Sequence, residues 1–216
     1  MTTTTVRHPS DARERYSTGT IALLVGAPLV MALGRALLVP LDDEDWDSVM
    51  TSMAANSGRS NTGWLLAVAA CGLLTVTAVV LAHQLRIVGK ARMAMFVTIT
   101  TAIGWAATAG TCLVGLYLAV AAEAPDRAAQ VQVQQDLNDS AAAGVGFLMV
   151  VIAAIGYIVL AVGLARSSIV TKGAAVLIAI GGAATLVTMG GPLTPLLVLA
   201  ALLLAAGHGL AARSEG

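Results

Sequence analysis

The sequence predicts an all-α fold: a polytopic transmembrane helical bundle of six spans arranged as three hairpins, with a short amphipathic helix in each of the two outer loops. Three observations support this prediction. The 216-residue chain is 57% hydrophobic and 11% charged, whereas a soluble domain carries about 25% charged residues. Six apolar stretches approach the ~20 residues that a bilayer-crossing helix needs. The connections between these stretches alternate between basic and acidic.

The six apolar stretches define the domain organisation. Spans are expected at residues 20–39, 63–85, 95–122, 143–165, 169–189 and 193–212. They form one transmembrane domain, 20–212, between an N-terminal tail, 1–19, and a C-terminal tail, 213–216. The last two spans are separated by "GGPLTP", where we expect the helix to be broken by Gly190, Gly191, Pro192 and Pro195.

The basic residues predict the orientation of the spans. Nine of the twelve fall on one side of the spans, which the positive-inside rule assigns to the cytoplasm; they are Arg7, Arg13, Arg15, Arg86, Lys90, Arg92, Arg166, Lys172 and Arg213. We therefore expect a multi-pass protein of the cell (plasma) membrane with both termini in the cytoplasm. The N-terminal tail lacks the apolar core and cleavage site of a signal peptide, so we expect it to be retained.

The charge balance also limits the partners. The formal net charge is zero, so no general attraction to nucleic acid is expected. The expected partner is the lipid bilayer. Other membrane proteins and self-association remain open, because glycines such as Gly104 and Gly181 suit contacts within one chain and between chains alike.

The first outer loop contains a dense acidic stretch, residues 42–47. Asp43, Asp45 and Asp47 have the spacing that begins a calcium loop, but Ser48 and Ala54 stand where glycine and glutamate are required. A DDxxD diphosphate motif would need an aspartate in place of Trp46. The sequence therefore offers no metal template here.

The same loop has the periodicity of a helix. An i, i+3, i+4, i+7 pattern is made by Trp46, Val49, Met50 and Met53. This pattern predicts an amphipathic helix over 43–55 that lies on the outer membrane face or caps the bundle, with Trp46 as an interfacial anchor.

A second helix is expected in the other outer loop. Pro125 suits a first helical turn, and Ala129, Val133 and Leu137 lie four residues apart on one face. Glutamines make most of the remaining surface polar. We expect a solvated helix that leads into the fourth span.

Arg35 is the ionisable residue that stands out within a span, and such residues are candidates for function. It lies five residues before Pro40, so its side chain could extend to the outer interface or pair with the nearby carboxylates. The other interpretation is a contact with an anionic ligand. Thr108 and Thr111 of the third span are candidate residues of the same ligand site, although a threonine hydroxyl can equally bond within its own helix.

His83 and His208 are candidates for a metal or haem site. Both lie near the cytoplasmic ends of their spans, and two histidines at similar depth can ligate one haem iron. The alternative is simple placement at the membrane interface. Cys71 and Cys112 lie in separate spans and are expected to be small apolar packing residues. No cofactor is predicted by a motif, and haem remains open.

The first hairpin carries a resemblance. The stretch "PLDDEDWDSVMTSMAANSGRSNTGWLLAVAACGLL", residues 40–74, joins an acidic helix containing tryptophan to "ANSGR" before the second span. It resembles six-span integral membrane proteins of unknown activity from high-GC Gram-positive bacteria. The resemblance covers about a third of the chain and implies a six-span topology.

Three functional hypotheses follow. The first is a non-enzymatic accessory or interaction component that uses the outer amphipathic helices as its contact surface. The second is a small-molecule permease, or an export or immunity protein, with a cleft near Arg35. The third is a haem-binding electron-transfer protein that uses His83 and His208. Serine-hydrolase, zinc-protease, P-loop and dinucleotide motifs do not occur in the sequence, so the sequence leans against an enzymatic activity but leaves catalytic groups in the outer loops open.

Overall fold

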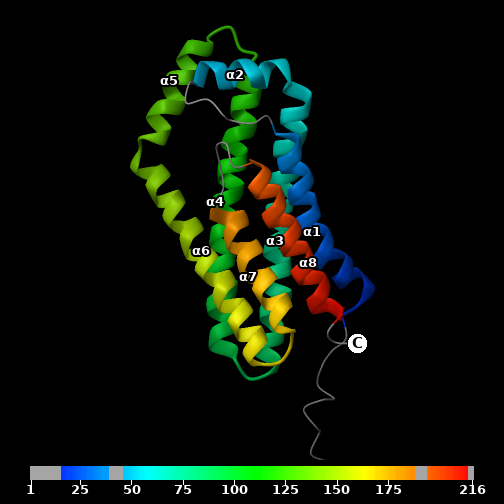
Figure 1. The fold of residues 1–216 in the computed structure, drawn as a ribbon. Helices are drawn as coiled ribbons and strands as arrows, with labels where there is room; N and C mark the ends of the chain where they lie inside the picture. Colours follow the sequence, from blue (N-terminus) through cyan, green and yellow to red (C-terminus); the bar gives the residue numbers. More distant parts are fainter. Residues whose placement is uncertain (1–15, 39–45, 188–193, 214–216) are drawn as a thin grey trace, which may run out of the picture.

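A computed structural model describes residues 16–38, 46–187 and 194–213, and every regular element within these ranges is an α-helix. The eight helices of this part of the chain are α1 (Thr18–Leu37), α2 (Trp46–Ala55), α3 (Ser57–Ile87), α4 (Ala91–Ala121), α5 (Arg127–Asn138), α6 (Ala141–Arg166), α7 (Lys172–Val187) and α8 (Thr194–Arg213). All except α2 and α5 run up and down the long axis of the molecule (Figure 1). These six upright helices lie at the positions of the six predicted spans.

Five of the upright helices, α1, α3, α4, α6 and α8, are long and apolar enough to cross a membrane. α7 is also apolar, but its 16 residues extend only about 24 Å at 1.5 Å per residue. This length is short of the ~30 Å hydrocarbon core of a bilayer. The predicted end of this span, residues 188–189, lies outside the described residues.

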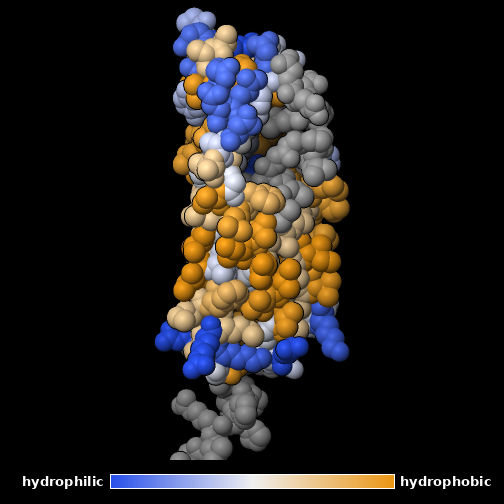
Figure 2. Space-filling model, turned by 90° about the vertical axis from the view of Figure 1, so that its left-hand side faces the viewer, coloured by the Kyte–Doolittle hydropathy of each residue, from blue (hydrophilic) through white to orange (hydrophobic). Residues whose placement is uncertain are grey.

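Large apolar side chains cover the outside of the upright helices. Met95, Leu113, Phe147 and Leu148 are each more than half exposed, and Figure 2 shows an apolar surface between two polar ends. Soluble monomers rarely expose contiguous apolar patches of this extent. Together with the five long helices, this surface is typical of a multi-pass membrane protein.

The upright helices form a closed ring in chain order. α1 packs against α3, α3 against α4, α4 against α6, α6 against α7 and α7 against α8, and α8 returns to α1. The predicted hairpins are all neighbouring pairs in this ring. The most extensive contact, however, joins α3 to α4, which belong to different predicted hairpins. The contacts therefore do not single out the hairpins as structural units.

Glycines hold the ring together by letting helix backbones approach closely. A Cβ atom on Gly34 would lie 2.9 Å from the backbone nitrogen of Ala67, where α1 meets α3. A Cβ atom on Gly104 of α4 would lie 1.9 Å from the Cβ atom of Ala153 in α6. Because lipid tails are as apolar as the helices, such close packing contributes much of the association energy in a membrane.

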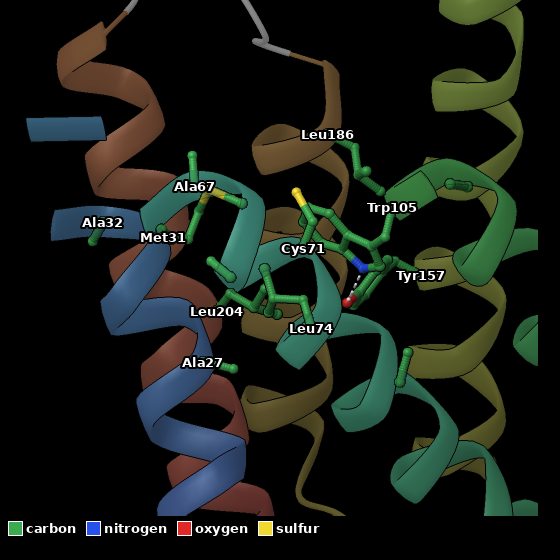
Figure 3. Close-up of a cluster of buried hydrophobic side chains, with 14 of the residues drawn as sticks. Ala27, Met31, Ala32, Ala67, Cys71, Leu74, Trp105, Tyr157, Leu186 and Leu204 are labelled. Atoms are coloured by element: carbon green, nitrogen blue, oxygen red, sulfur yellow. Dashed lines mark hydrogen bonds between the residues drawn. The ribbon is translucent and has the colours of Figure 1, made fainter. Parts of the chain in front are cut away.

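Two aromatic side chains fill the middle of the ring (Figure 3). Trp105 Nε1 donates a hydrogen bond of 3.1 Å to Tyr157 Oη. Their rings meet edge to face with centroids 6.2 Å apart, and both side chains are fully buried. Leu74, Leu186 and Leu204 are buried in the same core cluster. The interior of the ring at this height is therefore packed with side chains.

The two ends of the ring differ in charge. The end at the α3–α4 and α6–α7 turns, here named the basic end, carries Arg86, Lys90, Arg92, Arg166, Lys172 and Arg213. The chain turns there through Gly89, whose φ of +82° is readily adopted by glycine. The opposite end is covered by α2 and α5 and is named the cap end. α2 lies across this end of the ring (Figure 1).

α2 buries the face that its periodicity predicts. Val49, Met50 and Met53 are buried, and Trp46 packs half-buried against the core cluster. The helix therefore caps the bundle. Its described part begins at Trp46, because residues 43–45 of the predicted helix lie outside the described residues. The role of Trp46 as an interfacial anchor stays a prediction.

α5 turns its apolar residues outward, which the sequence does not predict. Val133 is 55% exposed and Leu137 is 38% exposed, whereas Gln134 is only 6% exposed. Polar contacts hold α5 in place: Tyr117 Oη donates to Gln130 Oε1, and Arg127 pairs with Asp47 of α2. These contacts fix the rotation of α5 about its axis.

Substitution of Gly104 tests the helix contacts. We expect Gly104→Ala to lower the free energy of unfolding by about 1–3 kcal/mol, the usual effect of overpacking a core. Gly110→Ala, in the same helix but with no atom near its added Cβ, should leave stability unchanged or raise it by up to ~1 kcal/mol. Unfolding in mixed micelles measures both. Equal effects of the two substitutions would contradict the described α4–α6 contact.

Candidate functional site

Arg35 lies inside the bundle near the cap end. Its side chain is 4% exposed; Nη2 lies 3.6 Å from Cys112 Sγ, and Cζ lies 5.6 Å from the centroid of the Trp64 ring. The side chain therefore points toward α3 and α4. It does not extend to the outer interface, although the sequence offers that placement as one interpretation. We name the group formed by Arg35, Trp64, Cys71 and Cys112, together with Ser60 one turn before Trp64 on the same buried face of α3, the Arg35 centre.

Small residues create the space for this group. The contact at Gly34 draws the last turns of α1 onto α3, and this approach brings Arg35 to Trp64. Gly115 of α4 makes room for the indole, because a Cβ atom there would lie 2.5 Å from Trp64 Cε2. Ser60, Trp64 and Cys71 recur at helical spacing on one buried face of α3. The local sequence thus places all three side chains on the face that meets Arg35 and α4.

The centre has a buried positive charge with little to balance it. In the described part of the chain, no carboxylate lies within ion-pairing distance of Arg35; Asp47 pairs instead with Arg127, at 2.9 Å. The thiol sulfur of Cys112 is a weak acceptor, and the face of Trp64 offers a cation–π contact, worth about 2 kcal/mol or more where the pair is desolvated. The acidic residues 42–45, predicted as possible ion-pair partners, lie outside the described residues.

Two further donors of the centre are unused. Trp64 Nε1 and Ser60 Oγ are buried without a hydrogen-bond partner in the described residues. Each buried donor left without an acceptor costs about 1–3 kcal/mol. The guanidinium, the indole N–H and the hydroxyl come from adjacent turns of α1 and α3. Chemically, such a set of donors is suited to hold an anion.

The structure brings the two cysteines together, which the sequence does not predict. The thiols of Cys71 and Cys112 are free and buried, and they lie near enough to influence each other electrostatically. Their spans are separate in the sequence, so nothing in the spacing of the two residues announces the contact. The available signal was indirect: Cys71 shares a helical face with Trp64 in α3, and Cys112 shares one with Gly115 in α4, the glycine that makes room for Trp64.

The two candidate threonines lie on different sides of α4. Thr108 is fully buried, one turn from Cys112 on the interior face of α4. Thr111 is exposed and donates its hydroxyl to the carbonyl of Ala107 at 3.2 Å. Of the three residues predicted for a ligand site, Arg35 and Thr108 therefore face the interior, whereas Thr111 faces outward and bonds within its own helix.

The two candidate histidines also lie in different surroundings. His208 is fully buried, and its Nδ1 lies 2.8 Å from the carbonyl oxygen of Leu24 in α1. His83 is exposed and lines a pocket between α1 and α3 to which His208 does not contribute. No group of three or more metal-binding side chains gathers within the described ranges. The structure does not place the two histidines in a shared pocket.

An ion pair joins the two helices of the cap end. Arg127 of α5 contacts the Asp47 carboxylate at 2.9 Å, and the same guanidinium donates to the carbonyl of Asp47 and to Thr51 Oγ1. Three bonds from one side chain thus tie the first turn of α5 to α2. A groove of about 260 Å³ lies beside this contact, between α4 and α5, and includes Tyr117, Val133 and Leu137 in its lining.

Comparison of the chain with protein-family models, curated proteins and solved structures finds no match.

The buried charge of Arg35 leads to a prediction about the stability of the folded protein. Replacing a buried charged group with an apolar one of similar size is often neutral or stabilising by about 1–4 kcal/mol. We therefore expect Arg35→Met to unfold at the same or a higher temperature than the unsubstituted protein in dilute HEPES without added salt. Strong destabilisation would show instead that Arg35 has a firm partner within the chain.

Proposed function

We propose that the protein is a six-span integral membrane protein of the cell membrane, arranged as three hairpins, with α7 as the short fifth span. The closed ring and the apolar surface between polar ends support this topology. The basic end is assigned to the cytoplasm by the positive-inside rule, because the connections there carry Arg86, Arg92, Arg166 and Lys172. In this orientation both termini lie in the cytoplasm, and α2 and α5 lie outside.

Within this topology, we propose that the Arg35 centre binds a small anionic solute. The observation that carries the proposal is the buried guanidinium of Arg35, 4% exposed and without a carboxylate partner in the described part of the chain. A charged residue inside a span is costly and usually has a functional partner. A bound anion would supply the missing negative charge at the place where it is needed.

The donors of the centre favour a carboxylate or an anion of similar size. A guanidinium can give two parallel hydrogen bonds to one carboxylate. Trp64 Nε1 and Ser60 Oγ, which are buried without partners, can each add one further bond. Bonds to a charged group are worth about 1.5–3 kcal/mol each. The site would therefore discriminate against neutral solutes of the same shape.

Access to the centre is controlled at the cap end. The buried face of α2, formed by Val49, Met50 and Met53, covers this end of the ring, and the Arg127–Asp47 ion pair holds α2 to α5. A solute arriving from outside would pass α2. Controlled entry of this kind fits a small-molecule permease or an export or immunity protein, a non-enzymatic role in which the anion is bound and released unchanged.

A second candidate function is that of an interaction component. It is favoured by the outward apolar residues of α5: Val133, at 55% exposed, and Leu137, at 38%, continue the surface of α4 formed by Leu113 and Tyr117. An apolar helix of another membrane protein would complete the groove. Isolation from native membranes tests this candidate, and recovery without a stoichiometric partner would count against it.

A panel of anions tests the proposed binding. Purified protein is melted in detergent with increasing chloride, nitrate, phosphate, acetate or a larger carboxylate. We expect at least one anion to raise the unfolding temperature in a saturable manner, because binding to the folded state stabilises it. Arg35→Gln should weaken the binding of that anion by about ten- to a hundredfold, because it removes one or two charge-assisted hydrogen bonds.

Arg59→Gln provides the matched control. Arg59 lies near the same end but is exposed, and it donates to the carbonyl of Ala36 at 3.1 Å. Both substitutions remove one guanidinium, so they change the general attraction for anions equally. The proposal fails if both variants respond to every anion as the unsubstituted protein does, or if both lose the response to the same degree.

A further inference from the structure

A second polar site lies at the basic end, far along the helices from the Arg35 centre. It is a pocket of about 460 Å³ between the beginning of α1 and the last turns of α3. The residues that line it are Tyr16, Ser17, Thr20, Val79, Val80, His83 and Gln84. The function proposed above uses none of these residues.

The polar side of the pocket includes the capped beginning of α1. Ser17 caps α1: its Oγ accepts from the backbone N–H of Thr20 at 3.2 Å and lies 2.9 Å from Thr20 Oγ1. The first N–H groups and the dipole of a helix attract negative charge. α1 has 20 residues, so its dipole is fully developed. This end of α1 therefore favours an anionic group in the pocket.

Gln84 is an independent sign of a ligand. Its side chain is 7% exposed and lines the pocket. It makes no hydrogen bond to the described residues. Its amide, with two donors and an acceptor, therefore opens into the pocket and is available to a molecule there. A polar ligand in the pocket would satisfy this amide.

Positive charge and an apolar track flank the pocket. Arg86 is exposed and lies three residues after His83, so the two side chains are neighbours on the surface of α3. On the other side, Val79 is 41% exposed, Val76 is 47% exposed and Ile21 of α1 is 38% exposed. A molecule in the pocket would therefore meet polar groups at one end and the apolar sides of α1 and α3 beyond.

We propose that this pocket binds an anionic phospholipid, with its phosphodiester at the beginning of α1 and its acyl chains along Ile21, Val76 and Val79. The combination of polar and apolar lining favours a lipid over free phosphate, which has no use for the valines. The inference is independent of anion binding at Arg35 and requires only that the basic end lies at a membrane surface. Anionic lipids are enriched in the cytoplasmic leaflet, where basic residues attract them.

Native mass spectrometry of delipidated protein in mild detergent tests this inference. The probes are phosphatidylglycerol, phosphatidylcholine with the same acyl chains, glycerol phosphate and inorganic phosphate. We expect one molecule of phosphatidylglycerol to bind more tightly than any of the other probes. His83→Leu, at an exposed position that should not disturb folding, is expected to weaken this binding about tenfold, the effect of one lost charge-assisted bond.

Arg86→Gln and Arg166→Gln separate the pocket from general charge attraction. Both residues are exposed, and both lie in the last turn of an upright helix at the basic end. We expect Arg86→Gln to weaken phosphatidylglycerol binding about tenfold and Arg166→Gln to leave it unchanged. The lipid site is ruled out if phosphatidylcholine or glycerol phosphate binds as tightly as phosphatidylglycerol. It is equally ruled out if His83→Leu has no effect, or if the two arginine variants behave alike.

Discussion

Close contact between helix backbones is the constraint on which the rest of this structure depends. An apolar chain in an apolar solvent gains little from burying more apolar surface, so the helices must fit one another closely. Gly34 lets α1 lie against the backbone of α3, and Gly104 does the same for α4 and α6. The position of Arg35 follows from the first of these contacts. Arg35 meets Trp64 because its neighbour in the sequence is a glycine at a helix crossing.

The same contacts enclose polar groups that the chain does not fully satisfy. Trp105 and Tyr157 satisfy each other through a hydrogen bond of 3.1 Å. Arg35 has a thiol at 3.6 Å and an indole face, which together offset less than a carboxylate would. A fold that tolerates such a cost generally recovers it through binding. We therefore regard the Arg35 centre as the part of the interior shaped by function, and the Trp105–Tyr157 pair as a part shaped by packing.

Sequence reasoning could place the helices but not the relations between them. Length and hydropathy located the six upright helices to within a few residues, and the spacing of Val49, Met50 and Met53 gave the buried face of α2. The contact of Cys71 with Cys112 could not be predicted, because it depends on the rotation of two helices whose surfaces are apolar all round. The direction of Val133 and Leu137 could not be predicted either, because the sequence predicts a solvated helix over this loop without fixing its rotation; the ion pair of Arg127 with Asp47 helps to fix it.

The central claim is that a bound anion, and not a carboxylate of the chain, balances the charge of Arg35. An experimental structure in lipid, determined with a bromine-labelled form of the anion that stabilises the protein most, tests it directly. We predict density for the anionic group within hydrogen-bonding distance of the Arg35 guanidinium and of Trp64 Nε1, with the anomalous signal of bromine directly beside it. Density that is absent from this position, with Arg35 bonded instead to one of the acidic side chains between residues 42 and 45, would contradict the account.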